Sequence, residues 1–235
     1  MSTQKPSVLI KDIDMNKITY LKAGKGGKLV YNYGTENDEN IQEFKFSTNT
    51  MYSPFGINEN QSKFSPHLEY SISASVNASE MDNAVATRES LELLDRRIED
   101  IIKEKSGSLN LQDDYVYFSF YKNSGNYPKL IKFSFPRDTH GNFKTTVFDN
   151  DKKKIPLSDS NISDIFKKGS LFKISVINKK IWTYNGKVGT IWDIDQVKLI
   201  KNDDANQQRK NDNGNDDVSI EETNPTQINS CIMLD

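Results

Sequence analysis

One long stretch of helical periodicity lies in the middle of a chain that otherwise alternates like β-strands. After a capping pattern at Ser79, apolar side chains recur at helical spacing until Ser106-Gly107 ends the run. The members of this stripe are Met81, Val85, Leu91, Leu94, Ile98, Ile101 and Ile102. They predict one amphipathic helix over residues 80–105, roughly 40 Å long at the standard rise. The stripe is one-sided, so the helix packs either on the protein's own sheet or on a second copy.

The segments on both sides of this helix read as short strands. "HLEYSISASV" alternates strictly before it, and "YVYFSFYK" and "KLIKFSFP" follow it as a hairpin pair across the turn from Asn123 to Pro128. Strands and helices do not alternate, and the chain has 35% hydrophobic but 10% aromatic residues, which favours a mostly antiparallel, β-rich α+β fold. We expect residues 1–201 to form one OB-like domain, a partly open antiparallel barrel with the helix inserted.

The charge is divided unevenly along the chain. Residues 202–235 carry eight acidic and two basic side chains, so this segment has a net charge of −6 and the preceding 201 residues one of +4. We predict a disordered acidic tail that either solubilises the protein or binds replication proteins and covers a basic surface. A basic body with such a tail is typical of proteins that bind polyanions, although +4 is also an ordinary charge for a body of this size.

Residues for metal or covalent chemistry are scarce. Cys231 is the only cysteine, and His67 and His140 stand far apart, which argues against a zinc or histidine metal site. No nucleophile elbow, Walker A loop or dinucleotide fingerprint occurs, so we predict no enzyme activity and no cofactor. "AGKGGK" from Ala23 to Lys28 is either a phosphate-holding loop or a plain turn. Without a signal-like or membrane-spanning apolar run, we expect an intracellular, reducing compartment (host cytoplasm or nucleus if the protein is viral) and no membrane partner.

Both tryptophans lie in "IWTYNGKVGTIW", where Asn185-Gly186 predicts a type I′ hairpin turn. A two-residue turn pairs Trp182 with Gly189. It places Trp182, Tyr184, Lys187 and Ile191 on one face, and the core-like Ile181, Thr183, Val188, Thr190 and Trp192 on the other. Trp182 either covers the bare backbone of Gly189 or offers its ring to a nucleobase.

Other strands predict further aromatic side chains next to lysines. In "YVYFSFYK", Val116, Phe118 and Phe120 are expected to face the core and Tyr117 and Tyr121 to face outward. The predicted nucleic-acid contacts are Trp182, Tyr184, Lys187, Tyr117, Tyr121, Lys132, Tyr31 and Lys28. Rings that stack bases and lysines that pair phosphates predict a non-catalytic, sequence-independent binder of single-stranded DNA, or of RNA, which could also form a homo-oligomer. The alternatives are a structural or scaffold protein with an aromatic protein–protein interface, and a carbohydrate-binding module.

Four features resemble a known group of proteins. They are "SPFG" from Ser53 to Gly56, the long central helix, the closing "IWTYNGKVGTIWDIDQVKLI" and the acidic tail. Together they are similar to the single-stranded DNA-binding proteins of large nucleocytoplasmic DNA viruses, and more loosely to those of tailed phages. The resemblance implies an OB-type core that coats single-stranded DNA during replication, recombination or repair. This chain ends in Leu234-Asp235 rather than an aromatic residue, which is a departure from the phage tails.

Overall fold

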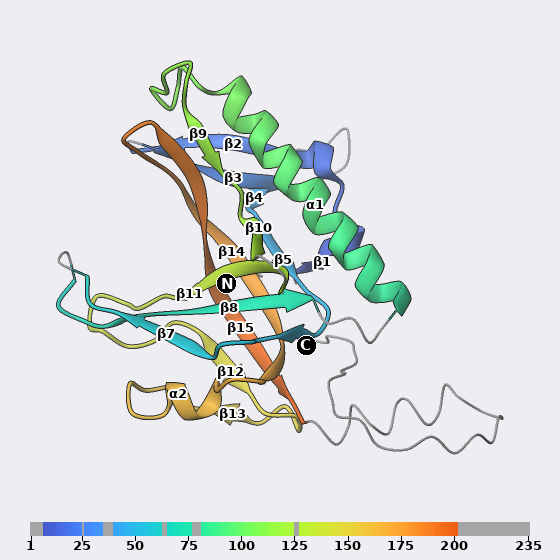
Figure 1. Ribbon diagram of the computed structural model, residues 1–235, viewed down its shortest axis with the longest axis vertical. Coiled ribbons are helices and arrows are strands. Elements are labelled where there is room, and N and C mark those ends of the chain that lie inside the picture. The colour runs from blue at the N-terminus through green and yellow to red at the C-terminus, as the bar shows by residue number, and fades with distance from the viewer. Residues whose placement is uncertain are drawn as a thin grey trace.

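The computed structural model describes residues 7–24, 26–34, 40–62, 65–76, 81–124 and 127–201, and the predicted acidic tail lies outside these ranges. Before the long helix come ten short elements (Figure 1). They are β1 (Val8–Leu9), the 3₁₀ turns η1 (Ile10–Asp12) and η2 (Met15–Lys17), β2 (Ile18–Ala23), β3 (Gly26–Asn32), β4 (Ile41–Glu43), β5 (Lys45–Ser47), β6 (Met51–Tyr52), β7 (Ile57–Asn60) and β8 (Glu69–Val76).

The long helix α1 (Met81–Glu104) occupies nearly the predicted range and is followed again by strands. These are β9 (Val116–Phe118), β10 (Tyr121–Ser124), β11 (Tyr127–Phe135), β12 (Thr146–Phe148), β13 (Lys154–Ile155), the four-residue helix α2 (Ile162–Ile165), β14 (Leu171–Tyr184) and β15 (Lys187–Ile200). Among the described residues, no helix combines the length and the apolar character that crossing a bilayer requires.

Helix α1 lies along one side of the sheet, as Figure 1 shows, and packs against η1, η2, β2, β8 and β10. Its buried side chains are Ala84, Thr87, Leu91, Leu94, Ile98, Ile101 and Ile102. Val85, predicted for this stripe, is instead exposed, because Ala84 and Thr87 face the sheet at the start of the helix. The helix therefore packs on the protein's own sheet, the first of the two predicted arrangements.

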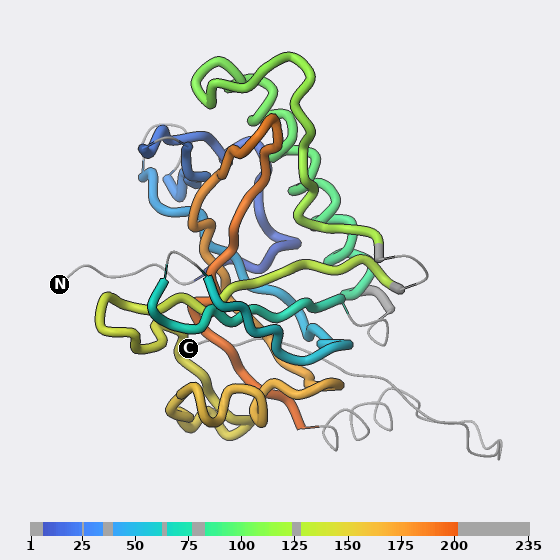
Figure 2. The backbone as a smooth tube through the Cα atoms, turned by 60° about the vertical axis from the view of Figure 1, so that its left-hand side comes forward, coloured from blue at the N-terminus to red at the C-terminus, as the bar shows by residue number. Residues whose placement is uncertain are grey.

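A hairpin of two 14-residue strands, β14 and β15, runs through the whole molecule (Figure 2). Trp182 pairs with Gly189, Thr183 with Val188 and Tyr184 with Lys187, as predicted from the Asn185-Gly186 turn, whose φ angles are 45° and 69°. The register shifts between Ser175 and Val176 and again between Asn178 and Lys180. These irregularities are bulges, which bend a strand without ending it.

The buried face of this hairpin forms the centre of the core. Ile181, Val188 and Trp192 are at most 1% exposed, as expected for the core-like face. The indole of Trp192 lies 5.1 Å from the ring of Phe46 and 5.5 Å from that of Phe120, measured between centroids. Such edge-on and tilted aromatic contacts stabilise a core beyond the area that they bury.

The sheet curves round to a barrel that is open along most of one seam, between β11 and β15. Pairings lead from β14 through β6, β8 and β11 to β15, which returns to β14. The contact between β11 and β15 consists of one residue pair, Ser134 opposite Asp193, in parallel orientation. The β-rich class and the partly open barrel agree with the sequence. The sheet is not purely antiparallel, because β1–β5, β11–β15, β12–β15 and β9–β15 are parallel pairs.

Candidate nucleic-acid interface

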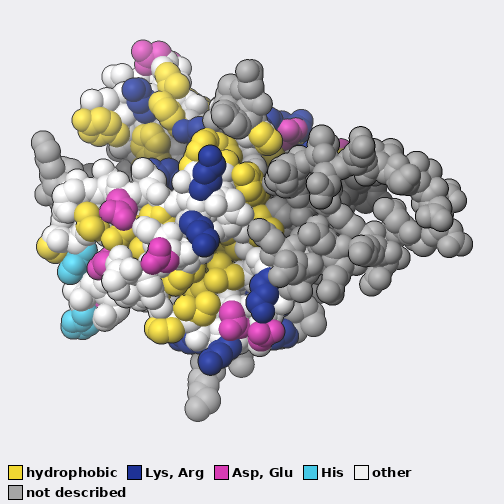
Figure 3. All heavy atoms as spheres, turned by 60° about the horizontal axis from the view of Figure 1, so that its bottom comes forward, with side chains coloured by type: hydrophobic (Ala, Val, Ile, Leu, Met, Phe, Trp, Pro, Cys, Tyr) yellow, Lys and Arg dark blue, Asp and Glu magenta, His cyan; other side chains and the backbone are white. Residues whose placement is uncertain are grey.

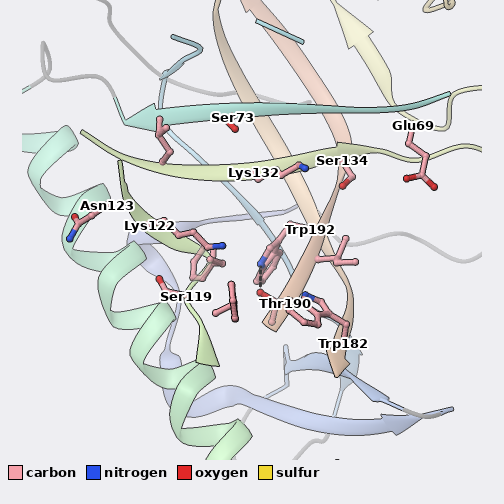
Figure 4. A pocket seen from close by; sticks show the side chains of 14 residues that line it. Glu69, Ser73, Ser119, Lys122, Asn123, Lys132, Ser134, Trp182, Thr190 and Trp192 are labelled. Atoms are coloured by element: carbon pink, nitrogen blue, oxygen red, sulfur yellow. Dashed lines mark hydrogen bonds between the residues drawn. The ribbon is translucent and has the colours of Figure 1, made fainter. Parts of the chain in front are cut away.

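A groove of about 610 Å³ opens where β11 and β15 separate from the Ser134–Asp193 pair. Trp182 of β14 and the segment around β9 and β10 form its walls, and Figure 4 shows Lys122 and Trp182 on its two sides, with Glu69 at one end. The residues that line it include Phe118, Phe120, Lys122, Lys132, Trp182 and Glu69. We call this opening the aromatic groove. It is of the size that proteins use for small ligands.

Trp182 reaches the aromatic groove from a half-buried position on β14. Its indole lies against Gly189, so a Cβ atom built on this glycine would be only 2.8 Å from Trp182 Cζ2. Its ring centroid is 5.9 Å from that of Phe118 at an interplanar angle of 53°. Covering the glycine backbone and lining the groove are therefore compatible roles for the same ring.

Phe118 is the second ring of the groove, and two ammonium groups lie near it. Lys122 Nζ is 5.0 Å and Lys187 Nζ is 5.7 Å from the centroid of the ring. Cations at this distance are attracted by the electron-rich face of an aromatic ring. The arrangement places positive charge next to an apolar surface. A nucleotide requires both, because its base stacks on the ring and its phosphate pairs with the cation.

The lysines at the groove are not paired with an acid among the described residues, although Glu69 lines one end of the groove. Within the described part of the chain, neither an ion pair nor a side-chain hydrogen bond is formed by Lys122, Lys132 or Lys187. Other lysines are paired, for example Lys129 with Glu92 at 2.7 Å. Figure 3 shows a face of the molecule on which separate Lys and Arg side chains stand beside hydrophobic ones. An unpaired ammonium group at an open surface can neutralise a phosphate without first breaking a salt bridge.

Asp95 of α1 holds the wall of the groove in place. Its carboxylate accepts hydrogen bonds from the hydroxyl of Tyr117 at 2.7 Å, from the hydroxyl of Ser119 at 2.6 Å and from the backbone N–H of Phe120 at 3.0 Å. Burial, together with the negative charge of Asp95, raises the pKa of the Tyr117 phenol. The phenol therefore stays a donor, and the segment that carries Phe118 is fixed to the helix by three bonds.

The predicted contact residues separate into two groups. Trp182 and Lys132 line the groove, and Lys187 reaches its Phe118 ring. Tyr184 is 69% exposed at the tip of the hairpin and does not line the groove. Tyr31, Tyr117, Tyr121 and Lys28 lie elsewhere or point away.

The prediction that Tyr117 and Tyr121 face outward is wrong. Tyr121 is buried, and burial raises its pKa to about 12, while Tyr117 is half-buried against Asp95. For Tyr121 the reason is a break at Ser119 and Phe120, which ends β9 after three residues and restarts the alternation in β10. Tyr117 precedes this break and faces helix α1, where its hydroxyl donates to Asp95. Val116 is accordingly exposed, and Phe118 lines the groove rather than the core. The predicted hairpin shrinks to β10 with β11, whereas β9 pairs in parallel with β15.

Tyr31 and Lys28 also lie outside the aromatic groove. Tyr31 is buried with Leu29, which occupies the same face of β3, and its ring centroid is 5.8 Å from that of Phe44. Lys28 forms a 2.7 Å ion pair with Glu43 and lines a different opening. Sequence reasoning missed Phe118 and Lys122. The sequence does show Phe118 four positions before Lys122, an aromatic residue close to a lysine. The prediction of one unbroken strand, however, placed Phe118 on the core side.

Gly189→Ala tests whether the position of the Trp182 ring depends on this glycine. The added methyl group would meet the indole, so we expect the ring to move and the free energy of unfolding to fall by about 1 kcal/mol. Tryptophan emission should change, and oligonucleotide affinity should drop roughly two- to fivefold, less than for loss of a stacked ring. Unchanged emission together with unchanged affinity would show that the ring position is not set by this contact.

No protein-family model and no curated protein sequence matches this chain. Solved structures with a similar fold include the single-stranded DNA-binding protein of bacteriophage Enc34 in complex with single-stranded DNA, at 12% identity and a TM-score of 0.46, covering 79% of this chain and 96% of that one. A single-stranded DNA-binding protein encoded by bacteriophage T7 has 12% identity and a TM-score of 0.44, covering 77% of this chain and 100% of that one. The Enc34 protein without DNA has 16% identity and a TM-score of 0.43, covering 79% and 90%. The resemblance to proteins of large DNA viruses stays a prediction.

Proposed function

We propose that this protein binds single-stranded DNA, without catalysis and without sequence preference, in the aromatic groove. The observation that carries the proposal is the combination of two half-buried rings that line the groove, Trp182 and Phe118, with three lysines that have no carboxylate partner among the described residues. Base stacking on such rings contributes about 1–3 kcal/mol per base and accepts every base, because each has an aromatic face. The lysines supply the attraction to the backbone that depends on salt but not on sequence.

The charge of the groove disfavours the alternative of a protein–protein interface. Lysine is depleted in the buried parts of interfaces, since desolvating an unpaired ammonium group costs free energy. Here Lys122 and Lys132 line the same opening as Trp182. A polyanion would neutralise these charges, whereas an apolar partner surface would bury them without compensation.

On this proposal the biological role is coating of single strands during replication, recombination or repair. The acidic segment, residues 202–235, would then contact replication proteins. The biological role rests on features of the sequence. The contact of residues 202–235 with replication proteins also rests on the sequence, because this segment is outside the described residues.

A titration of fluorescent oligo-thymidine against the full chain tests the proposal. We expect saturable binding, quenching of tryptophan emission, and an affinity that falls with salt with a logarithmic slope of about −0.7 per phosphate contact. Oligo-deoxyadenosine and oligo-deoxycytidine should bind with similar affinity, and oligo-uridine shows whether RNA is also bound. Binding that ignores salt, or no binding at all combined with self-association on a sizing column, would favour the scaffold alternative.

A further inference from the structure

A second opening lies on the other side of the Ser134–Asp193 pair. It has a volume of about 420 Å³ and is lined by charged side chains from β3, β4, β14 and β15 and from the segment between β11 and β12. We call it the charged cleft. The residues that line it include Lys28, Lys144, Lys179, Pro136, Asp193 and Asp195.

The charged cleft and the aromatic groove follow each other along the same two strands. On β11, Lys132 and Ser134 line the groove, and Pro136, the residue directly after this strand, lines the cleft. On β15, Ile191 lines the groove and Asp193 lines the cleft. The lining of the groove includes Ser134 and that of the cleft includes Asp193, so the two openings meet at the single Ser134–Asp193 pair. A strand bound in the groove can therefore continue over this pair into the cleft.

The cleft has more positive than negative charge around its central carboxylate. Asp193 forms an ion pair with Lys179 at 3.2 Å. Burial raises the pKa of Asp193. Three ammonium groups lie near this carboxylate, those of Lys179, Lys144 and Lys180, and their positive charges act against the rise in its pKa. The other two acids are already neutralised, Glu43 by Lys28 and Asp195 by Lys45. Lys144 forms no ion pair with a described residue.

We propose that the charged cleft is the continuation of the DNA-binding path, in which Lys144 and Lys179 hold phosphates of the nucleotides that follow those stacked on Trp182 and Phe118. The inference rests on the proposed function and extends it to a second, phosphate-binding subsite. Asp193 competes with the phosphate for Lys179. The cleft contains no aromatic ring among the residues that line it, so it contributes backbone contacts and no stacking.

The experiment compares oligo-thymidines of increasing length, from about three to about sixteen nucleotides, a range that covers the site sizes of OB-type binders. Lys144→Ala should leave the shortest oligomers unaffected, because they fit in the aromatic groove. For longer oligomers it should lower the affinity roughly fivefold at 0.1 M salt and reduce the salt slope by about 0.7, the effect of one lost phosphate contact. Asp193→Asn, which frees Lys179, should raise the affinity for the longer oligomers only.

Lys154→Ala is the matched control, since Lys154 is an exposed lysine on β13 that lines neither opening. The inference is overturned if Lys144→Ala behaves like Lys154→Ala at every length, if it weakens all lengths equally, or if Asp193→Asn brings no gain. The proposed function fails in a different way, namely if Trp182→Ala has no effect at any length. If Trp182→Ala weakens DNA binding as expected and Lys144→Ala does not, DNA binds in the aromatic groove but not in the charged cleft.

Discussion

Trp182→Ala is expected to cause one of the two largest losses of affinity for single-stranded DNA. Removing a ring on which a base stacks costs about 1–3 kcal/mol, equivalent to a roughly 5- to 150-fold higher Kd. The salt slope should stay unchanged, because the indole contacts no phosphate. Anisotropy of a labelled oligo-thymidine measures both quantities. Trp182→Phe should retain part of the affinity, since a smaller ring still offers a stacking face.

Tyr20→Ala is the matched control for this variant. The Tyr20 ring also lies over a glycine in the sheet, Gly27, and is also half-buried, but it does not line the aromatic groove. If Trp182 served only to cover Gly189, the two variants would lose similar stability and neither would lose DNA binding. A loss of affinity confined to Trp182→Ala identifies stacking as the cause.

Phe118→Ala extends the same experiment to the second ring. The two ring centroids are 5.9 Å apart, so both rings can contact one base or two neighbouring bases. With a shared base, the double variant should lose less affinity than the sum of the two single losses. With two separate bases, the losses should add within about 0.5 kcal/mol.

The parts of the fold that could be predicted are those fixed by neighbouring residues. Asn185-Gly186 determines its turn through two positive φ angles, so the pairing of Trp182 with Gly189 follows from counting along the chain. The long helix has its own periodicity over Met81–Glu104. Of the residues at the groove, only Trp182, Lys132 and Lys187 could be predicted. The strands that carry them run unbroken from the turn or the core pattern that was used to place them.

The rest of the site depends on contacts between distant parts of the chain. Asp95 accepts a hydrogen bond from the backbone of Phe120, 25 positions away, and this bond interrupts the alternation that was assumed for "YVYFSFYK". The parallel pairing of β9 with β15 joins Val116 to Lys187, 71 positions apart, and has no local signal. After the interruption Tyr121 faces the core instead of the surface. Before it, Phe118 faces the groove because β9 pairs with β15 instead of continuing the expected hairpin.

Asp95→Asn should weaken DNA binding although it removes a negative charge from a protein that binds a polyanion. Both carboxylate oxygens accept hydrogen bonds, two at Oδ1 and one at Oδ2. An amide nitrogen cannot accept, so the Ser119 hydroxyl would have to turn from Asp95 to the carbonyl of Tyr121 at 3.0 Å. The bonds from Tyr117 and Phe120 would lose the help of the negative charge, and together these changes cost about 1–3 kcal/mol. We expect the segment that carries Phe118 to become loose and the oligo-thymidine affinity to fall by up to this amount.

Glu69→Gln makes the same change of charge and should act in the opposite direction. Glu69 lines the aromatic groove and has an exposed carboxylate without a described ion-pair partner. Removing its repulsion of the phosphates should strengthen binding by less than about 1 kcal/mol, and high salt should abolish the gain. Asp95→Asn should keep the wild-type salt slope, since no phosphate contact is lost, and its circular dichroism should show a folded chain. If both variants strengthened binding, Asp95 would act only as a charge; opposite signs would identify it as the residue that positions the Phe118 wall.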